Sequence, residues 1–190
     1  LGIGSSLIYA PGNFANTDEL VALTTAAAEF GGSYISHMRS EAERYLESID
    51  ELLEIGRRAK ARVQIYHIKP GGKDNWYKAD LALAKLDAAR QAGIDVSANL
   101  YSYTAGSTGL YATMPLWVQQ GGHDAWVARL KDPVIRARVL AEMRGVVPEI
   151  YGLDLSPGML QQARRQHAQS NLVCGRACQL PFPDAAFDLI

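Results

Sequence analysis

The fold is decided by two segments with the same sequence pattern, SYISHMRSE (33–41) and VQIYHIK (63–69). Each contains a short run of β-branched and aromatic residues that closes on a histidine, His37 in the first and His67 in the second. Such runs predict buried strands, and the residues behind each histidine read as a helix or a loop. The pattern therefore predicts two neighbouring βα units, each with a histidine at the carboxyl end of its strand.

The same pattern extends to both sides with a period near thirty residues, typical of parallel βα units. Strands are predicted at 3–9, 33–37, 63–67 and 96–101, with helices between them. The order β-α-β-α-β-α-β indicates an α/β fold with a parallel sheet. A closed barrel and a doubly wound sheet share this order, so the pattern leaves both open.

The helices between the strands are predicted from apolar residues at helical spacing. In the first, Asn16 with Glu19 resembles a capping box, and in the second Ser40 with Glu43 does. The residues expected on the inner faces are Leu20, Leu23, Ala27 and Phe30 in the first helix, Ala42, Tyr45, Leu46, Ile49, Leu52, Leu53 and Ile55 in the second, and Trp76, Ala79, Leu83, Leu86 and Ala89, before a cap at Gly93, in the third.

The chain changes character near Gly145. Before this point, Asp132-Pro133 predicts the start of a helix that continues through Ile135, Val139 and Met143. After it, a strand at 149–154, a helix from 157, a strand at 172–173 and another from 187 are expected. We therefore predict two domains, 1–145 and 146–190.

Composition excludes several classes of partner. The net charge is −1 over 190 residues, without a basic block, so nucleic acid is not an expected partner. No apolar run approaches the ~20 residues that cross a bilayer, so no membrane segment is expected. Two cysteines close together do not make a disulfide framework, which favours a reducing compartment, the cytoplasm. The start at Leu1, without an initiator methionine or a basic region, is expected to lie inside a longer protein.

The two histidines are candidate metal ligands. Adjacent parallel strands lie ~4.8 Å apart, so imidazoles at the same ends of two strands can share one ion. The spacing alone leaves open that both are ordinary polar residues at strand ends. Arg39 and Glu41, just behind His37, are expected to form an ion pair that orients the loop.

Four motifs in order add a resemblance: LIYAPG (7–12), SHMRSE (36–41), HIK (67–69) and YSYTAGST (101–108). Together they resemble N-acyl-D-amino-acid deacylases (D-aminoacylases) of the amidohydrolase superfamily, from residue 1 to about 145. The resemblance implies about four βα units of a TIM-type (β/α) barrel. It also implies a hydrolase of linear amides, whose Zn²⁺ polarises the amide carbonyl of an N-acyl amino acid and activates a water.

The same resemblance implies roles for five residues. His37 and His67 are similar to the metal-binding histidines of the fifth and sixth barrel strands. Lys69 is similar to the lysine that pairs with the substrate carboxylate, and Tyr101 and Ser107 to residues of the substrate loop after the seventh strand.

Other parts of the deacylase pattern are missing. The His-x-His motif of the first strand, an early cysteine ligand and the general-base aspartate of the last strand do not occur in this sequence. We therefore expect little or no deacylase activity from this chain alone, and self-association through unpaired barrel edges.

The tail carries a second resemblance. Asp154 ends a predicted strand before a helix, where an acid either accepts hydrogen bonds from ribose hydroxyls or is only a turn residue. YGLDLSPGML (151–160) and LPFPDAAFDLI (180–190) resemble class I S-adenosylmethionine-dependent methyltransferases. This implies that Asp154 binds the cofactor ribose and that Met159 lies near the adenine. The glycine-rich first loop is absent, and Arg176 stands where an acid is usual.

Three interpretations remain: a metal-dependent amide hydrolase, a methyltransferase with an unusual amino-terminal extension, and a non-catalytic mosaic of two enzyme fragments. Retained stoichiometric zinc would favour the first, and saturable S-adenosylmethionine binding the second. A chain that retains no zinc, binds no S-adenosylmethionine and exposes apolar surface would favour the third.

Overall fold

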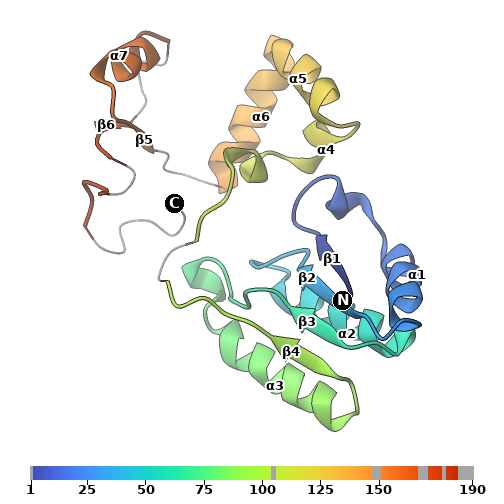
Figure 1. Cartoon of the computed structure of the whole chain (residues 1–190). Helices are drawn as coiled ribbons and strands as arrows, with labels where there is room; N and C mark the ends of the chain where they lie inside the picture. Colours follow the sequence, from blue (N-terminus) through green and yellow to red (C-terminus); the bar gives the residue numbers. More distant parts are fainter. Residues whose placement is uncertain (1, 104–105, 147–150, 167–170, 177–178, 184–190) are drawn as a thin grey trace. The chain divides into compact units, whose positions relative to one another are not determined.

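The computed structural model describes residues 2–103, 106–146, 151–166, 171–176 and 179–183. The chain forms two compact units, Leu1–Thr104 and Ala105–Ile190. Each unit has its own strands and helices (Figure 1).

The first unit is built on a four-stranded parallel sheet in the order β1-β2-β3-β4. Its strands are β1 (Gly2–Ser6), β2 (Ser33–His37), β3 (Val63–Ile65) and β4 (Val96–Ala98). The register pairs Ser6 with His37 and Ser36 with Ile65, so the carboxyl ends of β1, β2 and β3 lie along the same edge. The predicted order of parallel βα units is confirmed. β2 has its predicted bounds, and the other three strands are shorter than predicted.

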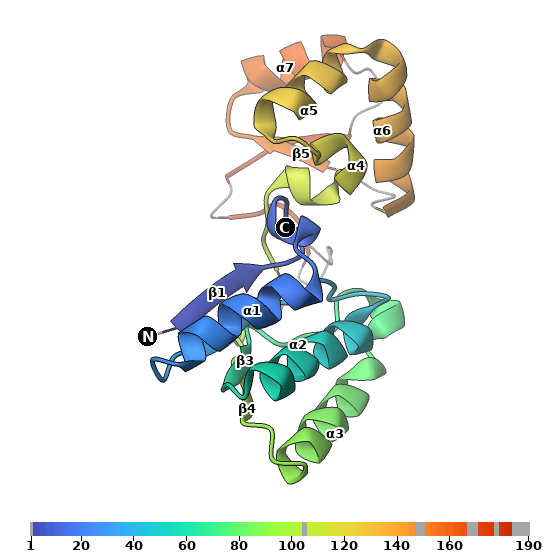
Figure 2. The ribbon, with the colours of Figure 1, turned by 90° about the vertical axis from the view of Figure 1, so that its right-hand side faces the viewer.

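One long helix connects each strand to the next: α1 (Thr17–Ala28), α2 (Tyr45–Ala59) and α3 (Lys78–Gln91). Short 3₁₀ turns, η1 (Gly12–Phe14) and η2 (Lys73–Asn75), lie in the loops before α1 and α3. Figure 2 shows the three helices side by side on one face of the sheet. The core lies between these two layers and is made by Leu20, Tyr34, Tyr45, Ile49, Leu52, Ile55, Val63, Ile65, Ala82, Leu86 and Val96, among others.

Helix α2 follows its predicted stripe closely. Tyr45, Ile49, Leu52 and Ile55 are all at most 2% exposed. The helix ends at Lys60, which takes a left-handed conformation with φ of 52°. A helix with a sharply amphipathic sequence has only one face that it can bury, so this face could be read from the sequence.

Helices α1 and α3 bury other faces than predicted. Leu23 and Phe30 are 48% and 90% exposed, whereas Leu20 and Thr24 are buried. In α3, Trp76 precedes the helix and Leu83 is 56% exposed, and the inner face is made by Lys78, Ala82, Leu86 and Ala89. Both helices have small or apolar residues on several sides, so helical spacing alone does not select a face.

Of the helix caps predicted at Asn16 and Ser40, only the first is found. Asn16 accepts a hydrogen bond from the Glu19 N–H at 2.9 Å, as predicted. The cap predicted at Ser40 is wrong, because α2 begins only at Tyr45. The Ser40 hydroxyl instead accepts from the Ala42 N–H within the preceding turn.

The second unit contains two groups of elements. A 3₁₀ turn, η3 (Leu110–Thr113), precedes α4 (Leu116–Gln119), α5 (His123–Lys131) and α6 (Pro133–Val146). Asp132 caps α6 as predicted, since its Oδ1 accepts from the N–H groups of Val134 and Ile135. A small core of Val118, Val139 and Met143 holds these helices together.

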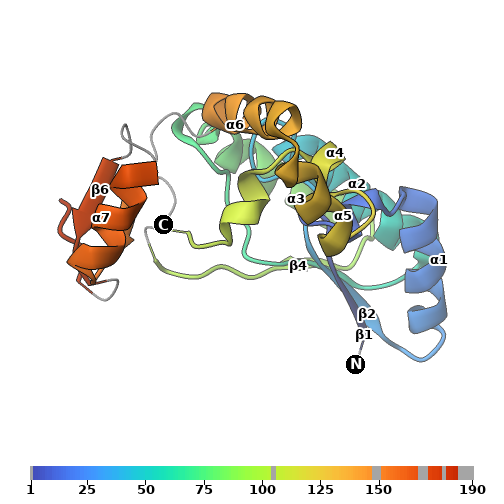
Figure 3. The ribbon, with the colours of Figure 1, turned by 90° about the horizontal axis from the view of Figure 1, so that it is seen from above.

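The second group is a βαβ segment. β5 (Tyr151–Asp154) pairs in parallel with β6 (Asn171–Cys174), and α7 (Pro157–Gln166) connects them. Figure 3 shows α7 alongside β6. The strand predicted from residue 187 lies outside the described residues. None of the helices in the described part of the chain combines the length and apolar character needed to cross a bilayer.

Candidate metal centre

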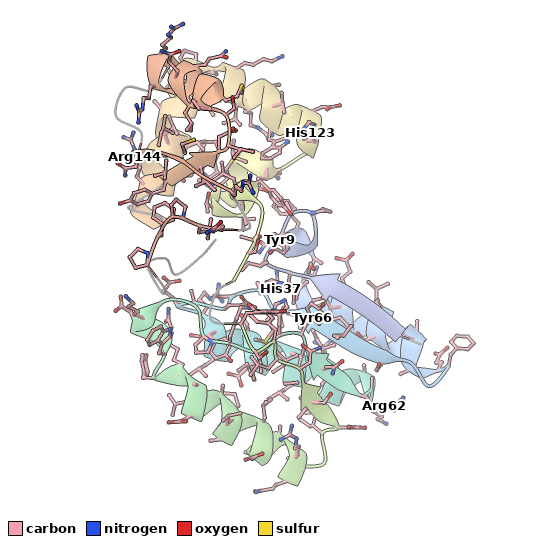
Figure 4. The ribbon with its side chains drawn as sticks, turned by 60° about the vertical axis from the view of Figure 1, so that its left-hand side comes forward. Tyr9, His37, Arg62, Tyr66, His123 and Arg144 are labelled. Atoms are coloured by element: carbon pink, nitrogen blue, oxygen red, sulfur yellow. The ribbon has the colours of Figure 1, made fainter. Side chains whose placement is uncertain are left out.

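The candidate site lies at the carboxyl edge of the first sheet. Figure 4 shows Tyr9, His37 and Tyr66 gathered at the end to which the strands point, and Arg62 at the opposite end. Loops at this edge of a parallel sheet are where α/β enzymes bind and convert ligands.

The structure brings the two histidines together. Their ring centroids are 4.4 Å apart and the ring planes meet at 80°. His37 is the last residue of β2, whereas His67 lies two residues after β3 in a left-handed conformation with φ of 42°. A positive φ is uncommon for a non-glycine residue and clusters at functional sites. The Asn99 side chain holds this conformation by accepting a 2.5 Å hydrogen bond from the His67 N–H.

Glu41 completes the cluster. Its Oε1 lies 2.9 Å from His67 Nδ1, 3.7 Å from His37 Nε2 and 2.7 Å from Lys69 Nζ. All these side chains are largely buried, with 12–28% of their surface exposed. The site therefore combines two imidazoles, one carboxylate and one ammonium in a small volume.

The ion pair predicted between Arg39 and Glu41 is wrong. Arg39 instead forms a two-pronged pair with Glu51 of α2, with both N–O distances at 2.9 Å. Its remaining donors go to the carbonyls of Asn13 and Ala15. Because Arg39 turns toward α2 and the loop before α1, the Glu41 carboxylate remains with the histidines.

The surroundings of His37 favour its neutral form. Burial, helped by electrostatic interaction with His67 and Lys69, lowers the pKa of His37 to about 4. The ring is therefore neutral at neutral pH, which is the form that binds a metal ion. Its Nε2 is buried and has no hydrogen-bond partner among the described residues, and such an atom is costly unless something binds it.

The residues fit a divalent metal ion. His37, Glu41 and His67 each offer one ligand atom, and these atoms all lie within 4.8 Å of one another. Two imidazoles and a carboxylate are a common ligand set for catalytic zinc, which keeps a further position for water or substrate. The arrangement is suited to Lewis-acid chemistry on a carbonyl group.

Two of the predicted substrate residues, Lys69 and Tyr101, lie in the same compact unit as the histidines. Lys69 Nζ lies 5.2 Å from the centroid of the Tyr101 ring, and that ring is 6.1 Å from the ring of His67. Ser107 is exposed in the other compact unit, and its role in substrate binding stays a prediction.

Sequence reasoning missed two members of the site, Glu41 and Tyr9. The Tyr9 ring is edge-on to His37 at 5.1 Å between centroids. For Tyr9 the available signal was its position just beyond the end of β1. For Glu41 the sequence carries no such signal, because residues 38–41 form no helix that would set its direction.

The two residues predicted to bind S-adenosylmethionine, Asp154 and Met159, are both exposed. Asp154 is exposed at the end of β5, and its Oδ1 accepts a 2.7 Å hydrogen bond from the Ser156 N–H. Met159 is 57% exposed on α7. A hollow of about 420 Å³ between α7 and β6 is lined by Pro157, Gly158, Leu160, Gln161, Arg164, Leu172 and Cys174.

Comparison with known proteins gives relatives for each part of the chain. The N-acyl-D-glutamate deacylase of Alcaligenes xylosoxydans xylosoxydans is 37% identical over 108 residues, 57% of this chain and 22% of that protein. The crystal structure of the N-acyl-D-glutamate deacylase of Bordetella bronchiseptica, complexed with zinc and a phosphonate inhibitor, superimposes with a TM-score of 0.52 and 34% identity. The match covers 53% of this chain and 22% of the Bordetella bronchiseptica chain.

The carboxyl-terminal part matches other proteins. A family model described as a methyltransferase domain matches residues 135–190. The demethylmenaquinone methyltransferase of Geobacillus sp. (strain WCH70) is 45% identical over 56 residues, 27% of this chain and 24% of that protein.

These matches confirm both resemblances. The amino-terminal portion has deacylase homologues and a parallel α/β fold in common with them, and a methyltransferase domain match covers the end of the chain. The chain spans about a fifth of the length of the deacylase relatives and about a quarter of that of the methyltransferase relative.

Proposed function

We propose that residues 1–145 form part of a zinc-dependent amidohydrolase that removes the acyl group of N-acylated amino acids. The observation that carries this proposal is the pair of imidazoles of His37 and His67, with ring centroids 4.4 Å apart at the carboxyl edge of a parallel sheet. The four βα units would then belong to a TIM-type barrel, and residues 146–190 to a separate methyltransferase-like segment.

In this proposal His37 and His67 hold the ion as neutral imidazoles. The chemistry supplied by a bound Zn²⁺ is Lewis acidity, which polarises an amide carbonyl and lowers the pKa of a bound water. Lys69, on the edge of the cluster, holds the carboxylate of the substrate by charge. Tyr101 packs beside the Lys69 ammonium and limits the directions it can take, and Ser107 contributes to the same substrate loop.

The 190 residues lack the deacylase general base, so we propose that this polypeptide by itself binds metal but hydrolyses amides poorly. A hydrolytic water needs a positioned group that takes its proton, and such a group is worth about 10²–10⁴-fold in rate. The zinc-loaded chain should therefore release the free amino acid from N-acyl-D-glutamate hardly faster than the same zinc-containing buffer without protein.

Metal analysis tests the metal site directly. Wild-type chain, His37→Ala, His67→Ala and His123→Ala are dialysed against zinc-free buffer and analysed for bound zinc. His123 is a matched control because it is an exposed histidine on α5. Wild type and His123→Ala should retain stoichiometric zinc, and the other two variants should lose most of it. Equal zinc in all four would contradict the proposal.

For the tail we propose a partial S-adenosylmethionine site, supported by the methyltransferase match at 135–190. Asp154 would bind the ribose hydroxyls through its carboxylate, and Met159 would contact the adenine. The test is calorimetric titration of the chain with S-adenosylmethionine, with Asp154→Asn as the variant and Asp124→Asn, an exposed acid on α5, as the control. Weak saturable heat that only Asp154→Asn removes would support this site, and no heat in the wild type would contradict it.

A further inference from the structure

The most informative feature left unexplained is the position of the Lys69 ammonium. Its Nζ is 2.7 Å from Glu41 Oε1, 3.0 Å from His67 Nδ1 and 3.3 Å from the His67 carbonyl. All three atoms belong to candidate metal ligands, and the first two are side-chain atoms that could bind a metal ion. A cation of the protein itself therefore lies among the atoms that would surround a metal ion.

We propose that Glu41 is a third metal-binding side chain and that Lys69 neutralises it until a divalent cation takes over. This inference rests on the proposed metal site at His37 and His67. It adds a ligand to that site, and it assigns Lys69 two alternative partners, the Glu41 carboxylate before the metal binds and a substrate carboxylate afterwards.

The distances support the third ligand. Around a tetrahedral zinc ion with ligand bonds near 2.1 Å, neighbouring ligand atoms lie about 3.4 Å apart. The Glu41 oxygen lies 2.9 Å from His67 Nδ1 and 3.7 Å from His37 Nε2, on either side of that value. All three ligand atoms lie within 4.8 Å of one another, so a modest adjustment of the side chains would be needed to place them around one ion.

The backbone that carries Glu41 is fixed. The Gly71 N–H donates a 2.6 Å hydrogen bond to the Glu41 carbonyl. Lys78, which is only 8% exposed, donates from Nζ to the carbonyls of Ala42 and Glu43 at 3.4 and 2.7 Å. This held loop aims Glu41 at the histidines, as a metal ligand requires.

Charge explains the exchange. A largely buried carboxylate needs a positive partner, and Lys69 supplies one. A divalent ion bound to the same oxygen would repel the ammonium and supply a larger charge in its place. Lys69 would then lose its partner on the protein beside the Tyr101 ring, and a negatively charged substrate would replace that partner.

The test is cobalt binding by the whole 190-residue chain, followed by visible absorption and by competition with a chelator of known affinity. The variants are Glu41→Gln, Lys69→Met and the matched control Glu43→Gln, which removes an exposed carboxylate two residues away on the same loop. Glu41→Gln should weaken Co²⁺ binding at least tenfold and change the absorption spectrum. Lys69→Met should tighten binding several-fold, and Glu43→Gln should match the wild type.

A different role for Glu41 makes different predictions. If Glu41 only orients His67 by accepting from Nδ1–H, glutamine can still accept that bond, and affinity and spectrum would stay as in Glu43→Gln. If Lys69 only holds Glu41 and His67 in place by hydrogen bonds, Lys69→Met would weaken Co²⁺ binding or leave it unchanged. Either result would overturn the inference, provided that circular dichroism shows the variants folded like the Glu43→Gln control.

The histidine variants separate this inference from the proposed function. If His37→Ala and His67→Ala bind Co²⁺ as tightly as the wild type, the metal site itself is wrong. If they lose the ion while Glu41→Gln keeps it, the metal site stands and only the role of Glu41 is wrong.

Discussion

Arg39 joins three parts of the first unit through one side chain. Its guanidinium donates two hydrogen bonds to Glu51 on α2 and one each to the carbonyls of Asn13 and Ala15, at 2.8–2.9 Å. Only a planar fork with several donors can satisfy all of these acceptors at once. The loop that leads from β1 to α1, and with it the neighbourhood of Tyr9, is thereby fixed to α2.

Arg39→Met is expected to lower the free energy of unfolding by about 2–3 kcal/mol, because it leaves a largely buried carboxylate and two carbonyls without this donor. Urea denaturation measures the change. Arg57→Met on α2 is the control. The Arg57–Glu54 pair is solvent-exposed and should contribute little to the free energy of unfolding. Similar losses in both variants would show that Arg39 has no special role.

His37 should make stability depend on pH in a defined window. An unfolded histidine takes up its proton near pH 6.5, whereas the folded pKa is lowered to about 4 by burial and by electrostatic interaction with His67 and Lys69. The unfolded state therefore binds more protons between these values, and stability falls as the pH drops from about 6.5 to about 4.

His37→Gln removes this titration and should flatten that part of the curve. The measurement is the urea midpoint of both proteins at pH 7.5 and 4.5, with a chelator present to keep metal away. The wild type should lose more stability than His37→Gln over this interval. A difference between the two proteins that does not change with pH would contradict the shifted pKa.

Single residues also show where sequence reasoning reached its limit in the site. The positions of His37 and His67 could be predicted, because strand ends meet at one edge of a parallel sheet. Glu41 could not, because its direction depends on a loop held by Gly71 and Lys78, which lie far along the chain. The ion pair predicted with Arg39 failed for the same reason, since the partner of Arg39 is set by tertiary packing against Glu51.

Among the helices, α2 could be predicted and the faces of α1 and α3 could not. The apolar residues of α2 form one stripe between charged residues, so one orientation buries far more apolar surface than any other. The inner face of α3 includes Lys78, whose ammonium is satisfied by three oxygens, of Ala42, Glu43 and Asn75. A buried lysine of this kind depends on contacts between distant segments, which helical spacing does not reveal.

The packing of α2 on β3 depends on a glycine in the helix. A Cβ at Gly56 would lie 2.9 and 3.0 Å from the two methyl groups of Val63. Gly56→Ala should therefore destabilise the protein by about 1–2 kcal/mol, although alanine favours a helix by up to about 1 kcal/mol.

Gly145→Ala in α6 is the matched control, because a Cβ there meets nothing within 4 Å. This variant should be unchanged or slightly stabilised, by up to about 1 kcal/mol. Thermal denaturation followed by circular dichroism measures both changes. Equal effects at the two glycines would mean that helix propensity, and not the approach to Val63, decides the result.

For the chain as a whole, the order of elements predicted a parallel α/β sheet, but closure into a barrel does not follow from it. Four parallel strands with helices on one face have the same order of elements whether or not further strands close the sheet into a barrel. In the described residues, β1 and β4 each pair with one neighbour only. On the outer edge of β4 the Val96 carbonyl accepts a 3.0 Å hydrogen bond from Arg90 Nε. An edge strand without a second strand beside it can pair with another chain.

We therefore expect the 190-residue chain to self-associate, with a sedimentation coefficient that rises with concentration. Ser97 is exposed in the middle of β4, and a lysine there should disfavour edge pairing, so Ser97→Lys should reduce association. Ala22→Lys, on an exposed position of α1, adds the same charge away from the edge and should have no such effect. A wild type that sediments as a monomer at all concentrations, or equal loss in both lysine variants, would show that β4 is not the contact. Reduced association in Ser97→Lys alone would identify the β4 edge as the contact between chains.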